Sequence, residues 1–244
     1  MVSNCLSIFL CVFVISGSLA TIPGGLKPCK QSADDYNQCI ATEIYRAIQF
    51  FKNGNEKLGV TPLEPYTFEK LVVDEGSGPV AITLEFKNVE FHGMTNNKIL
   101  DAKNDWKTVS FTTMIYSIEI LGDYTISGKV LVLPIQGTGK SNITMVDVEA
   151  KVTIKLKEVN SNGKHYIQAE SVDLKIAPKK TTFDFQNLFN GDKLLGANMN
   201  AFLNENHDQI IKELNPAMSK GLSQKIGETI NQILSKIPLK EVKV

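Results

Sequence analysis

The sequence lacks an excess of charge of either sign. It contains 26 Lys and Arg residues against 26 Asp and Glu residues among 244, so its formal net charge is zero. Proteins that bind nucleic acids concentrate positive charge on one face, and we therefore predict no nucleic-acid partner. The remaining composition, 43% hydrophobic and 21% charged, is that of an ordinary globular chain and excludes a disordered or fibrous protein.

Histidine is also scarce, and the motifs of hydrolases and metal sites are missing. The three histidines, His92, His165 and His207, are scattered without ligand spacing, which predicts no metal site. The chain has no G-x-S-x-G elbow, no H-E-x-x-H helix and no cysteine placed to react beside a histidine. We predict that the protein is not an enzyme and has no catalytic residues and no cofactor. A pair of carboxylates that only the fold brings together would escape this test.

One segment imitates a phosphate-binding loop. Residues 134–141 read Pro-Ile-Gln-Gly-Thr-Gly-Lys-Ser, but a P-loop requires glycine at the position of Pro134 and a helix after the serine. The residues that follow alternate as in a strand. We therefore predict no nucleotide site and interpret Gly137 and Gly139 as hairpin glycines.

Long hydrophobic runs are absent except at the N-terminus. Leu6 to Ile15 is apolar apart from one serine, which is typical of the hydrophobic region of a secretory signal peptide and too short to span a bilayer. Ser18 and Ala20 are small residues at the positions that a signal peptidase reads, so we predict a signal peptide over residues 1–20 and cleavage before Thr21. No basic residue precedes the apolar run, and a retained membrane anchor is the alternative.

Residues 21–244 would then form the exported protein as a single domain. No later segment reaches the length of about 18 apolar residues that a spanning helix needs. We predict a secreted, extracellular monomer without stable membrane insertion.

Cysteine is rare, and two of the four cysteines, Cys5 and Cys11, fall within the predicted signal peptide. The remaining pair, Cys29 and Cys39, predicts a disulfide in an exported chain. The short loop that it closes would contribute about 3 kcal/mol on the chain-entropy model. The single N-x-[ST] sequon predicts glycosylation at Asn142; an unused sequon is the alternative, because a strand is expected to begin there.

Both ends of the exported chain predict helices. Ser32 followed by Asp35 resembles a capping box, and the next apolar residues fall on one helical stripe that ends at Asn53-Gly54: Ile40, Ile44, Ala47, Ile48 and Phe51. Near the C-terminus, apolar residues recur every three or four positions. Pro216 is expected either to kink this helix or to restart it, which leaves residues 217–236 as one long helix.

Between these helices, from Tyr66 to about Ile176, apolar and polar residues alternate as in strands, most clearly from Val146 to Leu156. The alternation slips at Lys87-Asn88, which predicts a β-bulge. Pro178 is expected to end the last strand, and loops are predicted at Gly76–Gly78, Gly122-Asp123, Gly137–Gly139 and Asn160–Gly163. Long strands with one apolar face predict a strongly bent antiparallel sheet that wraps the C-terminal helix.

Several short motifs, spread from Cys29 to about Pro238, carry a family resemblance. They are Cys29 and Cys39; residues 59–65, Gly-Val-Thr-Pro-Leu-Glu-Pro; Gly122-Asp123-Tyr124 through Gly128 to residues 133–139, Leu-Pro-Ile-Gln-Gly-Thr-Gly; and residues 187–192, Asn-Leu-Phe-Asn-Gly-Asp, through Asn200 to residues 203–206, Leu-Asn-Glu-Asn. In this order and at these spacings they resemble the insect takeout and juvenile-hormone-binding protein family. Juvenile-hormone binders proper usually carry a second disulfide, and this chain has no cysteine after Cys39. The resemblance is therefore to the takeout branch.

The resemblance implies an α+β fold with a short N-terminal helix, in which a highly curved antiparallel β-sheet wraps a long C-terminal helix. Such a fold is similar to that of lipid-binding proteins of the bactericidal/permeability-increasing type. The resemblance also implies a secreted carrier, in haemolymph or another extracellular fluid, with an apolar tunnel for a terpenoid, fatty acid or other lipid.

A bent sheet cannot fill its interior with a single helix about 10 Å wide, so we predict a tunnel between the inner sheet face and this helix. The Tyr124 hydroxyl is expected to supply a polar contact, and the predicted lining is Ile82, Leu84, Phe86, Tyr124, Val130, Val132, Phe202, Leu222 and Ile226. The alternative is a secreted surface-active or protein-interaction module that engages a membrane or a partner protein and has a packed interior. A cavity of several hundred Å³ would separate the carrier from this alternative.

Overall fold

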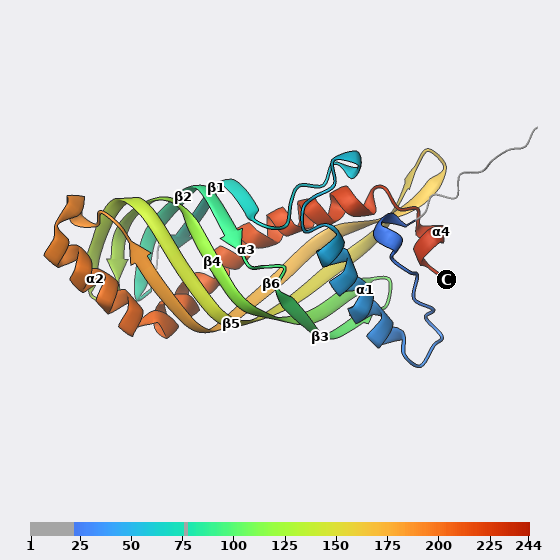
Figure 1. The fold of residues 1–244 in the computed structure, drawn as a ribbon, viewed down its shortest axis with the longest axis horizontal. Helices are drawn as coiled ribbons and strands as arrows, with labels where there is room; N and C mark the ends of the chain where they lie inside the picture. Colours follow the sequence, from blue (N-terminus) through green and yellow to red (C-terminus); the bar gives the residue numbers. More distant parts are fainter. Residues whose placement is uncertain (1–21, 76–77) are drawn as a thin grey trace, which may run out of the picture.

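The computed structural model describes residues 22–75 and 78–244. The predicted signal peptide with its cleavage site, and part of the predicted loop at Gly76–Gly78, lie outside these residues. The described chain forms one antiparallel sheet of six strands in the order β1-β2-β4-β5-β6, with β3 paired to β4 (Figure 1). The strands are β1 (Tyr66–Glu75), β2 (Val80–His92), β3 (Asn97–Asn104), β4 (Thr108–Val130), β5 (Leu133–Ser161) and β6 (Lys164–Phe185).

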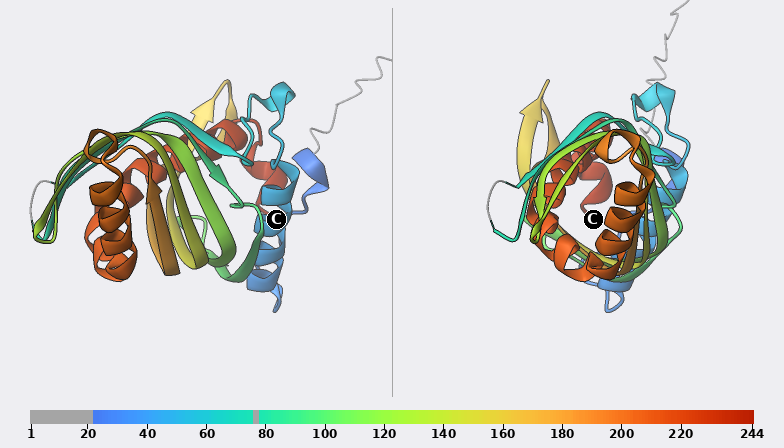
Figure 2. Two further views of the ribbon diagram at one scale, coloured as in Figure 1. Left: turned by 60° about the vertical axis from the view of Figure 1, so that its left-hand side comes forward. Right: turned by 90° about the vertical axis from the view of Figure 1, so that its left-hand side faces the viewer.

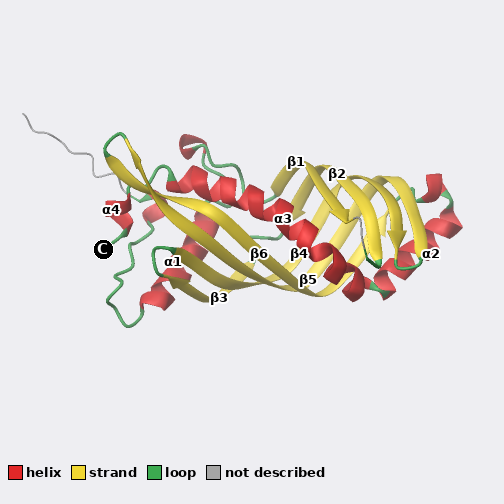
Figure 3. Ribbon diagram, turned by 180° about the vertical axis from the view of Figure 1, so that it is seen from behind, coloured by secondary structure: helices red, strands yellow, loops and turns green. Residues whose placement is uncertain are grey.

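The helices lie before and after the sheet in sequence. They are α1 (Tyr36–Phe50), α2 (Lys193–Glu205), α3 (His207–Leu234) and α4 (Leu239–Val242), with short 3-10 turns at Pro23–Gly25, Glu56–Leu58 and Phe189–Gly191. The long helix α3 contacts β6 and β1, the last and first strands of the sheet order, and runs along the long axis of the molecule (Figure 3). In the end-on view of Figure 2 the strands curl around the C-terminal helices. This is the arrangement that the sequence predicts.

Irregular positions bend the long strands. The register shifts between Lys87 and Glu90, at the predicted bulge, where Asn88 has a φ of 48°. Farther along the sheet, Asp147 in β5 has a φ of 51°, and the inward face changes there from odd-numbered to even-numbered residues. Val146 is consequently exposed and does not share the apolar face predicted for it. Because bulges increase local twist, such positions allow a strand of 29 residues to curve.

The predicted hairpins at Gly122-Asp123 and Gly137–Gly139 are wrong, because these glycines lie inside β4 and β5. The turn between the two strands is at Leu131 and Val132. Glycine in a strand interior marks a close approach of other atoms. A Cβ added at Gly137 would lie 2.8 Å from the Tyr124 hydroxyl oxygen and 3.0 Å from Leu188 Cα.

Three predicted boundaries also need correction. β6 continues through Pro178 to Phe185, which is possible because β6 is an edge strand, where a missing N–H is tolerated. The long helix begins at His207 and includes Pro216, since buried Leu214 and Leu222 hold the helix on both sides of the proline. Helix α1 begins at Tyr36 rather than near Ser32, and its first turn has no side-chain cap.

Asparagine side chains cover the free edge of β6. Each of three asparagines accepts a hydrogen bond from the backbone N–H of one β6 residue and donates its Nδ2–H to the carbonyl oxygen of the same residue, over 2.7–3.0 Å. We call these contacts the asparagine bridges; they join Asn200 to Phe185, Asn204 to Phe183 and Asn231 to Ala169. An unpaired strand edge is a site of unwanted association, and here the helices occupy part of it.

Candidate functional site

A cavity of about 500 Å³ lies inside the curved sheet, against the C-terminal half of α3. Its walls come mainly from α1, from the halves of β4, β5 and β6 that lie near α1, and from α3 between Met218 and Leu234, with a few residues of β1, β2 and β3. Residues 22 and 26–29, which precede the sheet in sequence, and Ile237 and Val242, which follow it, also line the cavity. The N-terminal arm and α4 lie at the same end of the molecule, near α1 (Figure 1). Most of these side chains are apolar, as expected of a site for a hydrophobic molecule.

The periodicity of the sequence builds these walls. After the irregular position at Asp147, every second residue of β5 points inward and lines the cavity from Val148 through Ala150 and Val152 to Ile154. On the opposite side, α3 contributes Leu222 and others at helical spacing. All five residues of the stripe predicted for α1 also line the cavity: Ile40, Ile44, Ala47, Ile48 and Phe51.

Of the nine residues predicted to line a tunnel, Leu222 and Ile226 line this cavity. Whether they contact a ligand remains a prediction. Six others lie outside it, in the packed part of the interior or against it: Ile82, Leu84, Phe86, Tyr124, Val130 and Phe202. Alternation identified the inward face, but it could not show where along the molecule opposing side chains fill the space.

The placement of Val132 in the lining is wrong. Its side chain is 82% exposed, because it lies in the turn between β4 and β5. The alternation of Val130 and Val132 continues across the turn, and the sequence alone could not distinguish this from a strand. The Tyr124 hydroxyl, expected as a polar contact for a ligand, instead donates a hydrogen bond to the carbonyl oxygen of Gln186 at 2.7 Å.

The lining also includes residues that the sequence did not single out, such as Trp106, Phe111 and Thr113. Phe111 and Thr113 belong to the first half of β4, where inward residues alternate with outward ones. This alternation could have identified Phe111 and Thr113 as inward-facing residues from the sequence. Trp106 lies in the loop between β3 and β4 with a φ of 66°, and nothing in its sequence neighbourhood indicated an inward position.

A polar pair lies within the apolar wall. The hydroxyl groups of Tyr66 and Thr229 are hydrogen-bonded at 2.8 Å, and both residues line the cavity. Thr229 Oγ1 donates to the carbonyl oxygen of Lys225 at 3.1 Å, so the shared proton of the pair comes from Tyr66. Burial raises the pKa of Tyr66 to about 12. The tyrosine is therefore a neutral side chain that joins β1 to α3.

Tyr66 and Tyr124 predict a loss of stability in alkaline solution. Burial raises the pKa of each to about 12, against about 10 for tyrosine in an unfolded chain. Between these values the unfolded chain loses both protons while the folded protein keeps them. The free energy of unfolding, undiminished below about pH 10, should fall as the pH approaches 12. Urea unfolding at each pH checks this. If the free energy of unfolding of the Tyr66→Phe variant falls as much as that of wild type, Tyr66 does not contribute to the alkaline loss of stability.

The N-terminal arm, residues 22–29, is fastened to α1 beside the cavity. The Lys27 backbone N–H donates to Glu43 Oε2 at 2.8 Å, and Arg46 Nη1 donates to Glu43 Oε1 at 2.8 Å. Arg46 Nη2 also donates to the carbonyl oxygen of Gly25 at 3.0 Å. The predicted disulfide between Cys29 and Cys39 is confirmed, with Cα atoms 5.8 Å apart. The disulfide and the two hydrogen bonds to the backbone of the arm together hold this part of the cavity wall.

Replacing Cys29 and Cys39 together by serine should lower the free energy of unfolding by about 3 kcal/mol, because the disulfide closes a short loop in the unfolded chain. Urea unfolding of the double variant, with chemically reduced wild type as the matched sample, measures the effect. If reduction leaves the wild type as stable as before, this expectation is refuted.

Within residues 22–75 and 78–244, no group of three or more histidine, cysteine, aspartate or glutamate side chains is placed to hold a metal ion. In the same part of the chain, no helix has the length and apolar character needed to cross a membrane.

Comparisons with known proteins place the fold. The family model described as haemolymph juvenile hormone binding protein (JHBP) matches residues 7–243. The circadian clock-controlled protein daywake is 24% identical in Drosophila melanogaster and 23% identical in Drosophila yakuba, each over 90% of this chain and 87% of that protein. Takeout 1 of Epiphyas postvittana is similar in structure, with a TM-score of 0.79 and 21% identity over 89% of this chain and 99% of the other. The α+β fold with its curled antiparallel sheet is thereby confirmed.

Proposed function

Because the chain belongs to the haemolymph juvenile hormone binding protein family, we propose that it is a secreted carrier that holds one small hydrophobic molecule in its internal cavity. The observation that carries the proposal is the cavity of about 500 Å³ with an almost wholly apolar lining. A surface-active module with a packed interior has no use for such a space. A terpenoid, a fatty acid or another lipid fits the chemistry of the walls.

Burial alone supports useful affinity. Each CH₂ group removed from water contributes about 0.8 kcal/mol, so roughly ten such groups reach the free energy of about 8 kcal/mol that corresponds to micromolar binding. No charged contact is required. The ligand would lie between α3 and the inward residues of β5, with Leu222 and Ile226 on one side.

Polar atoms in the wall would orient the ligand. Asn97 Oδ1 and Trp106 Nε1 are buried without a hydrogen-bond partner among the described residues, and both residues line the cavity. An unpaired buried acceptor or donor costs about 1–3 kcal/mol. A small movement of these side chains would let a hydroxyl, carbonyl or ester group of a ligand reach the two atoms and recover part of that cost, so we propose a ligand with one polar group on an apolar body.

Export is part of this proposal and rests on the apolar run at residues 6–15 and the disulfide. The test expresses the full chain in insect cells and recovers it from the medium. The intact mass should show a chain that begins at Thr21, and native mass spectrometry followed by organic extraction should find one bound lipid. A protein that yields no lipid and displaces no fluorescent fatty acid would refute the carrier, whatever its N-terminus.

A further inference from the structure

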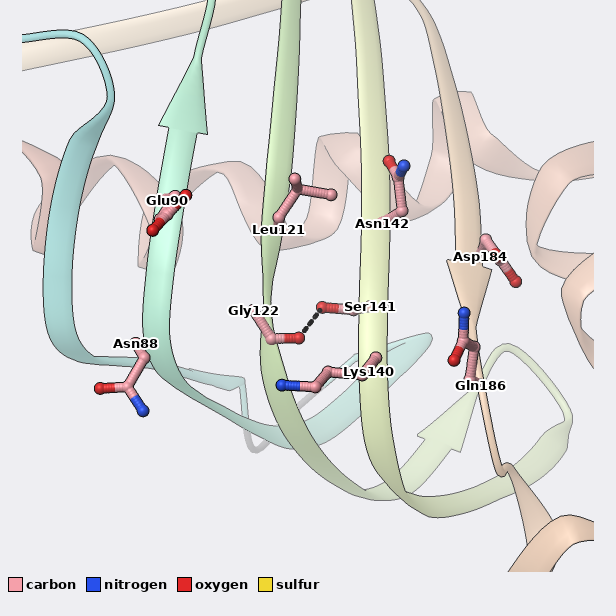
Figure 4. Close-up of a pocket in the computed structure, with 9 residues that line it drawn as sticks. All are labelled: Asn88, Glu90, Leu121, Gly122, Lys140, Ser141, Asn142, Asp184 and Gln186. Carbon is pink, nitrogen blue, oxygen red and sulfur yellow. Dashed lines mark hydrogen bonds between the residues drawn. The ribbon is translucent and has the colours of Figure 1, made fainter.

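A groove of about 370 Å³ lies on the outer face of the sheet and is lined by residues other than those of the internal cavity (Figure 4). Four of its residues form one row across neighbouring strands, because Glu90 of β2 pairs with Leu121 of β4, Leu121 with Asn142 of β5, and Asn142 with Asp184 of β6. Adjacent strands are about 4.8 Å apart. The row therefore has one carboxylate at each end, Glu90 and Asp184, with the side chains of Leu121 and Asn142 between them.

Backbone features open this groove. The bulge on β2 displaces Asn88 from regular pairing, and Gly122 leaves room for it on the inner side, because a Cβ there would lie 3.2 Å from Cβ of buried Val89. Ser141 Oγ donates to the carbonyl oxygen of Gly122 at 3.1 Å, so its hydroxyl does not project outward into the groove. Figure 4 shows Leu121 extending toward β5, where Asn142 stands beside it.

The hydrogen bonds of Asn142 leave one amide hydrogen unused. Its Nδ2 donates to Glu119 Oε1 at 2.7 Å, and its Oδ1 accepts from Thr144 Oγ1 at 3.3 Å. A side-chain amide carries two hydrogens on nitrogen, so the second is available for substitution while both contacts persist. Asn142 is half-buried rather than covered, and it begins the sequon Asn142-Ile143-Thr144.

We propose that Asn142 is glycosylated and that the groove seats the first sugar of the glycan; this rests on the export included in the proposed function. The sugar is transferred from an oligosaccharide activated as a lipid pyrophosphate. A bond forms between its anomeric carbon and Nδ2, the bond from that carbon to the pyrophosphate oxygen breaks, and Nδ2 loses one proton. The ring then lies on Leu121, and its hydroxyl groups donate to the carboxylates of Glu90 and Asp184, which accept hydrogen bonds only.

The first experiment tests attachment. Protein secreted by insect cells is weighed intact before and after peptide-N-glycosidase treatment, which converts the linked asparagine to aspartate. Wild type should lose the mass of one glycan and show this conversion at Asn142. Asn142→Gln and Thr144→Ala should carry no glycan, and Thr144→Ser should keep it. A chain that begins at Thr21 without a glycan overturns the inference and leaves export standing. A chain that keeps residues 1–20 overturns the predicted cleavage before Thr21, and such a chain without a glycan overturns the inference as well.

The second experiment tests seating. If the first sugar lies in the groove, the glycosidase should remove the glycan from the folded protein about tenfold more slowly than from Leu121→Ala, a factor that corresponds to about 1.4 kcal/mol. Asp184→Asn should also be faster than wild type. Leu100→Ala, which changes an exposed leucine on β3, should match wild type, and all proteins should react equally after denaturation. If the glycosidase removes the glycan from folded wild type and from Leu121→Ala at the same rate, the proposal that the first sugar lies in the groove is overturned.

Discussion

Replacing Ala150 by tryptophan should abolish ligand binding while the protein remains folded. Ala150 lies in the middle of the cavity wall on β5, paired with Thr113 on β4 and Ile176 on β6, and all three residues line the cavity. An indole at this position would project into the space that the ligand needs. We expect the affinity for a fluorescent fatty acid to fall by at least about tenfold, a loss of about 1.4 kcal/mol or more.

Two matched tryptophan variants make this test specific. Val132→Trp changes a residue that is 82% exposed and should leave binding unchanged and stability within about 0.5 kcal/mol of wild type. Ile126→Trp changes a residue of the packed interior and should cost about 1–3 kcal/mol of stability by overpacking. Urea unfolding and ligand displacement are measured on each. Full binding by Ala150→Trp, or destabilisation as large as that of Ile126→Trp, would count against an open cavity at Ala150.

Replacing Asn200 and Asn204 together by leucine should lower the free energy of unfolding by about 4–6 kcal/mol. The double variant removes two asparagine bridges and leaves the N–H and carbonyl groups of Phe183 and Phe185 without their partners. Each unsatisfied buried backbone group costs about 1–3 kcal/mol, and solvent that reaches the edge offsets part of the total. Urea unfolding gives the size of the loss, and each single variant should show roughly half of it.

Asn198 supplies the control for this prediction. It lies on the same helix, is exposed, and takes no part in the asparagine bridges, so Asn198→Leu should remain close to wild type. The double variant should also associate, because an unpaired edge strand pairs with other chains, and light scattering would detect this. A double variant as stable and as monodisperse as Asn198→Leu would mean that the bridges contribute nothing measurable.

Periodicity predicted the fold and the inward faces from the sequence. The stripe of α1, from Ile40 to Phe51, and the alternation of β5 after Asp147 both describe walls that the structure contains. These features are local, because a side chain's direction follows from its own helix or strand. The Cys29–Cys39 disulfide was equally predictable, since no other cysteine pair remains after residue 20.

The position of the cavity could not be predicted, because it depends on what each inward side chain meets across the interior. Ile82 and Ile154 are alternating residues of the same kind, yet one lies outside the lining and the other lines the cavity. The role of the glycines was not predictable for a related reason. Gly137 is required by the approach of Tyr124 and Leu188, which are distant in sequence, and a close contact of this type leaves the same local pattern as a turn.

The uneven filling of the interior has a consequence for how the protein responds to hydrostatic pressure. Pressure favours the state of smaller volume, and unfolding removes internal voids. A cavity of about 500 Å³ near α1 makes that half of the molecule the more compressible one whenever no ligand fills it. Under pressure the strands around the cavity should lose their amide protection before those near α2, and a molecule that fills the cavity should remove the difference.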